Sequence, residues 1–366
     1  MKRLLLIAVV ALMTTLSAVA QRIQVVDTDG NPVSYASVMT TDAKYIGITD
    51  LNGMLADVKG ATDVVISHVA FKTKNAKIDR SAGTQVITVE DADFGLNEIT
   101  VQPKPYVYVQ TYYRVYSYYS NDMGIVYYRA GLTDNVYDRA KKKVSSSTDH
   151  VAKAKYGIIK FALGLFGSLL DEKSELRVRK FEDRLLDYGK EVDLKITDLE
   201  PGKRIITDIK DTIGYIIDDM EARQRNFSYN STKVKKHKIE IEGKEKQLAK
   251  LEKREEKRQN REESEFQIYL IDEDGNYVPE DFVMKQDMDS YDEMEDGEMV
   301  HKIFCFQVFS TDRAYVDKAE LKQRKKDNKM KLTYENIEQF ERQHNIPPLP
   351  SAVQQKINEV WKVDKE

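Results

Sequence analysis

The alternation of apolar and polar residues divides the chain into a run of short β-strands and a longer, mixed remainder. Between Arg22 and Val101 the apolar residues fall in short β-branched runs separated by clusters of Gly, Asp and Asn, namely IQVV, YASVMT, KYIGIT, DVVISHV, TQVITV and EITV. Such spacing is typical of a small antiparallel sandwich. We therefore expect residues 21–101 to form an all-β domain.

A Tyr-rich segment follows the stiff linker 102–105, in which each proline favours an extended predecessor. Ten of the 21 tyrosines in the chain lie between positions 106 and 137. Alternation predicts two strands here, the first with Tyr106, Tyr108 and Tyr112 on one face. These three tyrosines are the candidate ligand surface, suited to a glycan or another flat ligand. The alternative is a half-exposed sheet in which tyrosine serves as a good strand residue.

Charge dominates the second half of the chain. We expect 106–230 to be a Tyr-rich α+β region, with strands in DLKITDL, KRIITDI and IGYII around the turn at Pro201 and Gly202. Residues 231–265 carry 12 Lys or Arg and 9 Glu. They predict a long solvated helix, because the heptad seam is too polar for a coiled coil.

The last segment, 266–366, predicts two strands, an acidic loop and C-terminal helices. The strands are EFQIYLI and KIFCFQVF, and Val353 and Ile357 lie on the apolar face of the last helix. Between the strands, 272–298 holds 12 acidic residues against one lysine. This composition favours a disordered, self-repelling loop, with weak cation capture as the alternative. Taken together, the segments predict an α+β multidomain protein that begins with a β-sandwich and ends in helices.

The first twenty residues have the pattern of a secretory signal peptide. A basic start at Lys2 and Arg3 precedes an apolar stretch and the small-residue site Ala18-Val19-Ala20. We expect cleavage after Ala20 and export. The apolar segment 156–170 is too short and too interrupted to cross a bilayer, so we expect a core or interface helix there and no membrane span after cleavage.

Two nearly identical motifs, DTDGN at 27–31 and DEDGN at 272–276, raise the question of calcium. A calcium loop of the EF-hand type needs Gly at position 6 and Glu at position 12. Pro32 and Val38 stand at those positions in the first copy, and Tyr277 and Val283 in the second. Because Asp-Gly between two strands is a strong turn signal, we interpret both copies as turns and predict no metal site.

The N-terminal segment also resembles the carboxypeptidase regulatory-like domain. The resemblance rests on Asp27, Gly30, Pro32, Val33, Ala36 and Val38, then Gly47, Thr49, Asp50 and Gly53, then 64–71, and on the closing strand LNEITV. It covers about 80 residues, with Ala70 in place of a common glycine. It implies a seven-stranded, transthyretin-like antiparallel sandwich without catalytic residues, in a secreted envelope protein of a Bacteroidota-type, Gram-negative bacterium.

Candidate catalytic chemistry is sparse. The single cysteine, Cys305, lies in an apolar strand and predicts a buried thiol. The five histidines are scattered, and the pair His237 and Glu240 lies on a charged helix that offers no closed zinc cavity. The sequence contains no GxSxG, HExxH or P-loop motif. We therefore predict no enzyme activity, no catalytic residues and no cofactor.

Three hypotheses about function are compatible with these patterns. The first is a non-enzymatic, exported protein of the periplasm or cell surface that binds or scaffolds an envelope protein or a glycan. A net charge of −4 offers no strong field for nucleic acid. The second is a periplasmic carrier that holds an apolar ligand in a curved central sheet, and the third is an unrecognised hydrolase.

Overall fold

The computed structural model describes residues 21–363, apart from 80, 82, 95–103, 120–124, 142, 151–180, 183–184, 186–192, 209–210, 231, 233–235, 237–238, 241, 296, 328–331 and 334. The expected signal peptide, the apolar segment 156–170 and the first half of the linker 102–105 lie outside the described residues.

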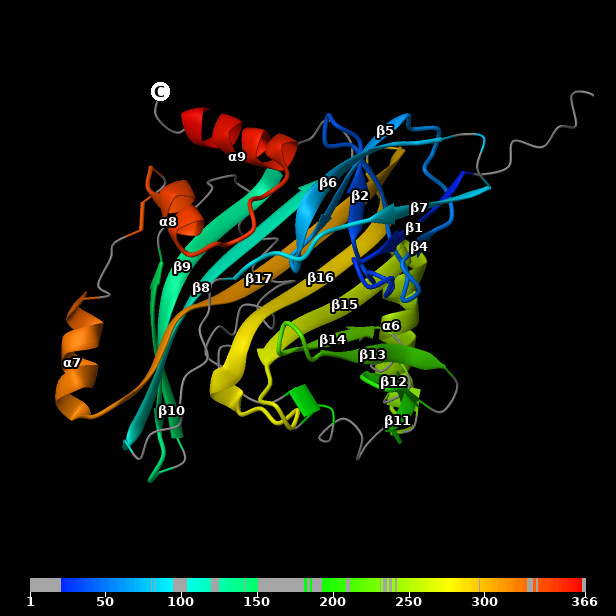
Figure 1. Ribbon diagram of the computed structural model, residues 1–366. Helices are drawn as coiled ribbons and strands as arrows, with labels where there is room; N and C mark the ends of the chain where they lie inside the picture. The colour runs from blue at the N-terminus through cyan, green and yellow to red at the C-terminus, as the bar shows by residue number, and fades with distance from the viewer. Residues whose placement is uncertain are drawn as a thin grey trace, which may run out of the picture.

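A ten-stranded antiparallel sheet forms the body of the molecule (Figure 1). Its strands in chain order are β8 (Tyr106–Tyr119), β9 (Ile125–Asp138), β10 (Lys143–His150), β11 (Lys195–Glu200), β12 (Lys203–Thr207), β13 (Thr212–Asp219), β14 (Gln224–Asn230), β15 (Gln259–Leu270), β16 (Phe282–Glu295) and β17 (Glu298–Val316).

The spatial order is β10-β9-β8-β17-β16-β15-β14-β13-β12-β11. Strands consecutive in the chain are therefore neighbours in the sheet, and the last strand, β17, pairs with the first, β8. Of the consecutive strands, β10 and β11 are the exception, because they form the two opposite edges of the sheet as the structure describes it. The topology is an antiparallel meander in which β8 and β17 also pair with each other, while β10 and β11 remain the two edges of the described sheet.

The expected α+β fold class is wrong. Strands make up 51% of the structure and helices 19%, and a single large sheet occupies the region expected to mix helices and strands. The charged helix expected at 231–265 is interrupted and ends early. Thr232, Lys236, Ile239 and Glu240 are helical, and a turn follows at 242–243. Helix α6 then spans Glu245–Lys257, and β15 begins at Gln259. The expected disordered acidic loop is also wrong, since 14 of its residues form β16.

The acidic strand β16 forms because its side chains alternate between two environments. Met284 and Met288 are buried in the hydrophobic cluster that includes the N-terminal strands. Acidic residues between them pair with nearby cations, as in the 2.8 Å ion pair of Asp287 with Lys285. A count of charges hides this period of two, which is the signature of a strand.

The N-terminal strands form two smaller sheets. One has the order β4-β1-β7, with β1 (Arg22–Val26), β4 (Met54–Leu55) and β7 (Thr84–Thr88); the other has the order β3-β2-β5-β6, with β2 (Ser37–Met39), β3 (Tyr45–Ile48), β5 (Asp63–His68) and β6 (Phe71–Lys77). The expected antiparallel, seven-stranded sandwich with an α+β region after it is therefore corrected. Strands β1 and β7 run parallel, and the large sheet comes after them in the chain.

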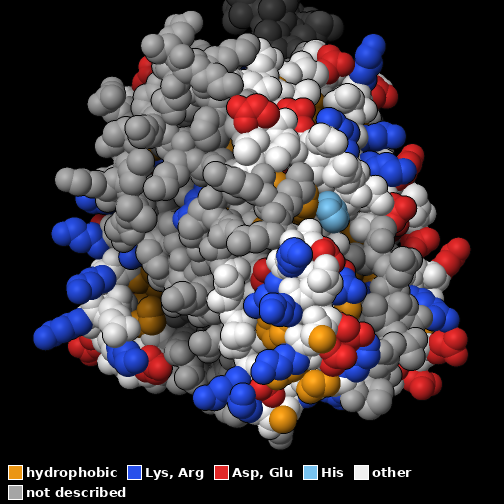
Figure 2. Space-filling model, turned by 90° about the vertical axis from the view of Figure 1, so that its left-hand side faces the viewer, with side chains coloured by type: hydrophobic (Ala, Val, Ile, Leu, Met, Phe, Trp, Pro, Cys, Tyr) orange, Lys and Arg blue, Asp and Glu red, His pale blue; other side chains and the backbone are white. Residues whose placement is uncertain are grey.

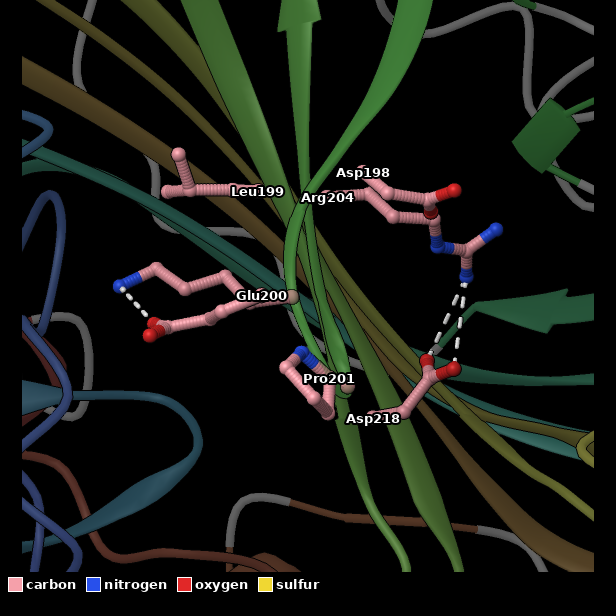
Figure 3. A pocket seen from close by; sticks show the side chains of 8 residues that line it. Asp198, Leu199, Glu200, Pro201, Arg204 and Asp218 are labelled. Carbon is pink, nitrogen blue, oxygen red and sulfur yellow. Dashed lines mark hydrogen bonds and ion pairs between the residues drawn. The ribbon is translucent and has the colours of Figure 1, made fainter.

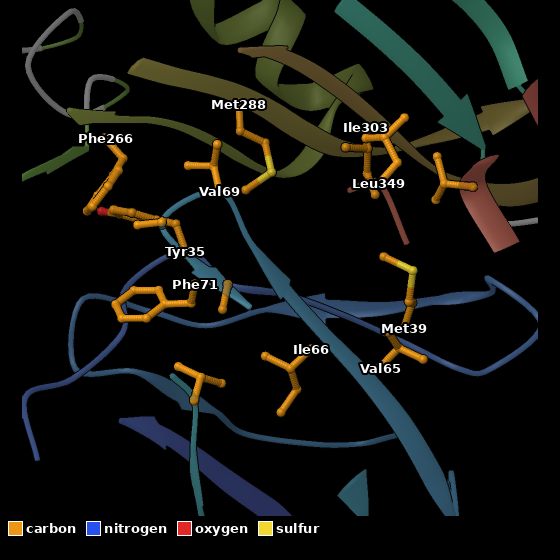
Figure 4. Close-up of a cluster of buried hydrophobic side chains, with 14 of the residues drawn as sticks. Tyr35, Met39, Val65, Ile66, Val69, Phe71, Phe266, Met288, Ile303 and Leu349 are labelled. Carbon is orange, nitrogen blue, oxygen red and sulfur yellow. The ribbon is translucent and has the colours of Figure 1, made fainter. Parts of the chain in front are cut away.

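The N-terminal part is packed on the large sheet through a continuous hydrophobic core (Figure 4). Ser37 Oγ lies 3.7 Å from Met288 Sδ, and the His68 ring meets Phe266 edge-on at 4.6 Å between centroids. The ring of Tyr45 stacks on His301 at 4.0 Å. The N-terminal strands and the sheet therefore share one core across the linker.

Helices cover part of the same face of the sheet. In Figure 1, α8 (Ile337–Gln343) and α9 (Ser351–Val363) lie beside the ends of β8 and β9, and α7 (Lys318–Asp327) comes after β17. Val353 and Ile357 of α9 are each 1% exposed, which confirms the predicted apolar face. Within the part of the chain that the structure describes, no helix combines the length and the apolar character that a membrane crossing requires.

Both Asp-Gly motifs form the same turn. Asp27 Oδ1 accepts hydrogen bonds from the backbone N–H groups of Asp29 and Asn31, at 3.0 and 2.7 Å. Asp272 Oδ1 does the same for Asp274 and Asn276, at the same two distances. The turn interpretation is confirmed, because each carboxylate satisfies the backbone of its own loop.

Candidate binding surface

The three tyrosines proposed as a ligand surface do not form one. Tyr108 and Tyr112 are fully buried, and Tyr106 is half-buried. The Tyr108 hydroxyl lies 2.6 Å from Asp134 Oδ1, and the Tyr112 hydroxyl donates to Glu341 Oε1 at 2.7 Å. Burial raises the pKa of Tyr112 well above its usual value. The expectation that these side chains face solvent is corrected: they belong to the core.

Both faces of β8 are covered. Val107, Val109 and Tyr113 point to the opposite face and are buried as well. On the first face, the Tyr112 ring packs between Phe309 of β17 and Phe340 of α8. The cover comes from residues more than 190 positions away in the chain. A strand that is apolar or aromatic on both faces is typical of a sheet buried on both sides.

A buried ion pair fixes the C-terminal segment to strand β8 of the large sheet. Arg114 Nη1 lies 2.9 Å from Glu341 Oε1, with the two side chains 2% and 8% exposed. The Arg114 guanidinium also donates to Gln307 Oε1 at 2.6 Å and to the backbone carbonyl of Pro347 at 2.8 Å. With its donors satisfied inside the core, this arginine is a structural residue rather than a binding group.

The other face of the sheet is also filled. An aromatic cluster runs across it, and Phe181 and Leu185 from the connection between β10 and β11 lie within that cluster. The ring of Phe181 contacts Phe227 at 4.5 Å between centroids. A carrier of an apolar ligand would hold its ligand against this face of the sheet. In this structure Phe181 and Leu185 occupy the face instead.

Ion pairs hold the same connection in place. Glu182 lies 3.9 Å from Arg204 and 3.8 Å from Arg225. Arg225 in turn forms a two-pronged contact with Asp218, at 2.5 and 2.7 Å. These charges neutralise one another within the protein.

A second charged group lies deeper on this face, where β15 meets β16. Arg261 contacts both oxygens of Asp289, each at 3.0 Å, and also pairs with Glu263. Desolvation by burial raises the pKa of Asp289. No group of three His, Cys, Asp or Glu residues that could hold a metal occurs in the part of the chain described by the structure.

The sole cysteine is not poised for chemistry. Cys305 is 1% exposed, and its Sγ lies 3.6 Å from Gln286 Oε1. Burial raises the pKa of the thiol to about 12. A nucleophilic cysteine needs a lowered pKa and access to solvent. The predicted buried strand cysteine is confirmed.

A shallow hollow of about 380 Å³ lies at the turn between β11 and β12 (Figure 3). Its charged side chains pair with each other, since Arg204 contacts Asp218 at 3.4 Å and Lys203 contacts Glu200 at 3.6 Å. Gly202 has φ of +77°, which the tight Pro201-Gly202 turn requires. The hollow therefore offers an ionic ligand little net charge.

The strand beside this hollow, β11, is the most exposed strand of the large sheet for which all residues are described. All six of its residues are solvent-exposed, including Ile196 at 43% and Leu199 at 57%. It pairs with β12 on one side, and on the other side the described structure has no neighbouring strand. Pairing with β12 is regular from Lys195 to Asp198, and a bulge follows before Glu200.

An edge strand presents a row of backbone N–H and C=O groups that can pair with a further strand. The opposite edge, β10, is KVSSSTDH, in which small polar residues predominate. Sequence reasoning identified KITDL as a strand but assigned it no role. The sequence did contain one sign of a role, namely the two large apolar residues Ile196 and Leu199. Their position at an edge of the sheet could be known only from the tertiary structure.

The comparison with known proteins assigns no family to this chain. No family model matches this sequence, and no curated protein matches it. The resemblance of the N-terminal segment to the carboxypeptidase regulatory-like domain therefore stays a prediction.

Proposed function

We propose that this chain is a non-enzymatic, exported cell-envelope protein that acts as a binding or scaffolding module. The observation that carries the proposal is the edge at β11, where six exposed residues border a sheet of ten strands and no further strand pairs with them in the part of the chain that the structure describes. A partner with an extended segment would add a strand to this edge. Backbone hydrogen bonds would supply affinity, and contacts with Ile196 and Leu199 would supply preference for apolar side chains.

The rest of the structure suits a rigid platform for such an edge. The N-terminal strands and the large sheet share one hydrophobic core, and the buried pair Arg114–Glu341 fixes the C-terminal segment. A rigid edge loses little conformational freedom when a partner strand binds. The region expected to contact the partner lies after residue 105, as β11 does.

Site-specific photocrosslinking in the exporting cell tests this function. A photoreactive residue at position 196 or 197 is expected to give a crosslinked adduct, because the partner backbone would lie within reach. The matched control is position 220, where Met220 is 51% exposed on the neighbouring β13–β14 turn but lies off the edge. Equal adducts from all three positions, or adducts from position 220 alone, would contradict strand addition.

A second substitution experiment separates binding from folding. Ile196→Lys, which removes the apolar contact, is expected to lower the adduct yield from position 197. Met220→Lys is expected to leave that yield unchanged. Circular dichroism of both variants checks that the sheet is intact.

A second candidate function is the periplasmic carrier of an apolar ligand. The aromatic inner face of the sheet favours it, provided that Phe181 and Leu185 can leave that face. An apolar fluorescent dye that binds Phe181→Ala more tightly than the wild type would support a carrier. Lipid extracted from the purified wild-type protein would do so too. Dye binding by neither protein would leave the open edge as the functional surface.

A further inference from the structure

The surface helix α7 carries its charges on two separate sides. At 100° per residue, Lys318, Lys322, Lys325 and Lys326 fall within an arc of about 100°. We refer to these four residues as the lysine face. The two acidic residues of the helix, Glu320 and Asp327, lie on the opposite side. Figure 2, which views the molecule from the side where α7 lies in Figure 1, shows several Lys and Arg side chains on the lower part of this surface, with Asp, Glu and hydrophobic side chains among them.

The contacts that hold α7 in place do not use the lysine face. Leu321 packs beside Tyr106 and Ala314. Arg324 forms an ion pair with Asp312 at 2.5 Å, and Glu320 pairs with Lys104 at 2.7 Å.

Around the lysine face itself, the part of the chain that the structure describes offers no carboxylate within ion-pair distance of Lys318, Lys322, Lys325 or Lys326. One side of α7 is therefore fixed to the sheet. On the other side Lys318, Lys322 and Lys326 are exposed, and Lys325 is half-buried.

The other exposed helix differs in its balance of charge. Helix α6 has five basic and four acidic residues over 13 positions, whereas α7 has five basic and two acidic residues over ten. The whole chain carries a net charge of −4. The positive charge of α7 is thus a local feature rather than a reflection of overall composition.

We propose that the lysine face binds the surface of a membrane rich in anionic phospholipids. The face has no exposed large apolar residue and no arginine fork, so it lacks the groups that anchor a protein–protein contact or read a fixed phosphate pattern. Lysines are flexible point charges, which suits headgroups that can move laterally beneath them. An exported protein of the envelope would meet such a surface, so this inference adds a membrane contact to the proposed binding function without depending on β11.

The expected affinity can be calculated from the number of lysines. Each lysine near an anionic surface strengthens binding about fivefold, so four give a partition constant on the order of 10³ M⁻¹. Half of the protein should therefore be bound at about 1 mM accessible lipid in low salt. Salt weakens the attraction because the Debye length falls to about 3 Å at 1 M.

Co-sedimentation of the full chain with vesicles tests the proposal. Vesicles of equal parts phosphatidylglycerol and phosphatidylcholine are expected to bind the wild type, and pure phosphatidylcholine vesicles are not. The fourfold variant Lys318→Gln, Lys322→Gln, Lys325→Gln and Lys326→Gln is expected to weaken binding at least about 100-fold. The matched control places glutamine at Lys246, Lys250, Lys253 and Lys257 of α6, which neutralises as many charges and should leave binding within about twofold.

Several results would overturn the proposal. They are equal loss in both variants, binding to pure phosphatidylcholine, binding that survives 1 M salt, and displacement by a single-stranded oligonucleotide at equal phosphate concentration. The last result would assign the lysine face to a polyanion in solution. Thermal melting of both variants confirms that each is folded, since the exchanged residues are outside the core.

Discussion

Arg114 and Glu341 form a 2.9 Å ion pair in the interior of the protein, although 226 residues separate them in the sequence. Arg114 belongs to β8, the third strand from the β10 edge of the large sheet, and Glu341 belongs to helix α8 near the end of the chain. The pair therefore joins the start of the large sheet to the end of the chain. It also accounts for the burial of the Tyr-rich strand, because the Tyr112 hydroxyl donates to the same Glu341 oxygen.

Loss of one partner of this pair should strongly destabilise the protein. We expect Glu341→Gln to lower the free energy of unfolding by about 3–5 kcal/mol, because it leaves the Arg114 charge buried without its counter-charge. Urea denaturation followed by circular dichroism measures the change. The matched control is Glu338→Gln, which removes the exposed pair with Arg342 on the same helix and should cost less than about 1 kcal/mol. Equal effects in the two variants would contradict the structural role of the buried pair.

The interface between the N-terminal strands and the large sheet should be sensitive to acid. Burial lowers the pKa of His68 to about 3, below its usual value near 6.5. The unfolded chain therefore binds a proton that the folded protein does not, and stability falls as the pH drops from about 6.5 towards 3. We expect His68→Leu to make the free energy of unfolding less dependent on pH in this range, by about 1.4 kcal/mol per pH unit. Urea midpoints between pH 6 and 4 measure it; identical slopes in variant and wild type would show His68 to be solvated.

Gly53 occupies a position that no other residue fits. Its φ is +69°, and an added Cβ would lie 2.3 Å from the Val25 carbonyl oxygen. Gly60 has φ of +75° but open space around it, which makes Gly60→Ala the control for backbone strain alone. We expect Gly60→Ala to cost about 1–2 kcal/mol and Gly53→Ala to cost more. The difference in melting temperature measures the steric part, and a smaller loss for Gly53→Ala would contradict the close approach.

The buried thiol should report on global unfolding. Because Cys305 is buried and its pKa is raised, we expect the native protein to react with a thiol reagent at pH 8 at least about 100-fold more slowly than the denatured protein. Absorbance of the released chromophore follows the reaction. Rapid labelling without urea would mean that β17 opens locally.

The sequence by itself determined much of the local structure. Alternation in 106–119 and the turn residues after it predicted β8 and β9, and Pro201-Gly202 predicted the turn between β11 and β12. The two Asp-Gly turns, the buried Cys305 and the apolar face of α9 were also predicted from short patterns. These features depend on neighbours a few residues away, so the chain encodes them directly.

Only the tertiary structure decided which strands are neighbours and which side chains face solvent. Pairing of β17 with β8, and the cover of Tyr112 by α8, join residues more than 180 positions apart. The acidic content of 272–298 concealed β16, because its charges are neutralised by partners such as Lys285 and Arg261 that a composition count cannot place. The open edge at β11 has the same origin. A strand is an edge because of what does not lie beside it, and the folded arrangement of the other strands fixes that.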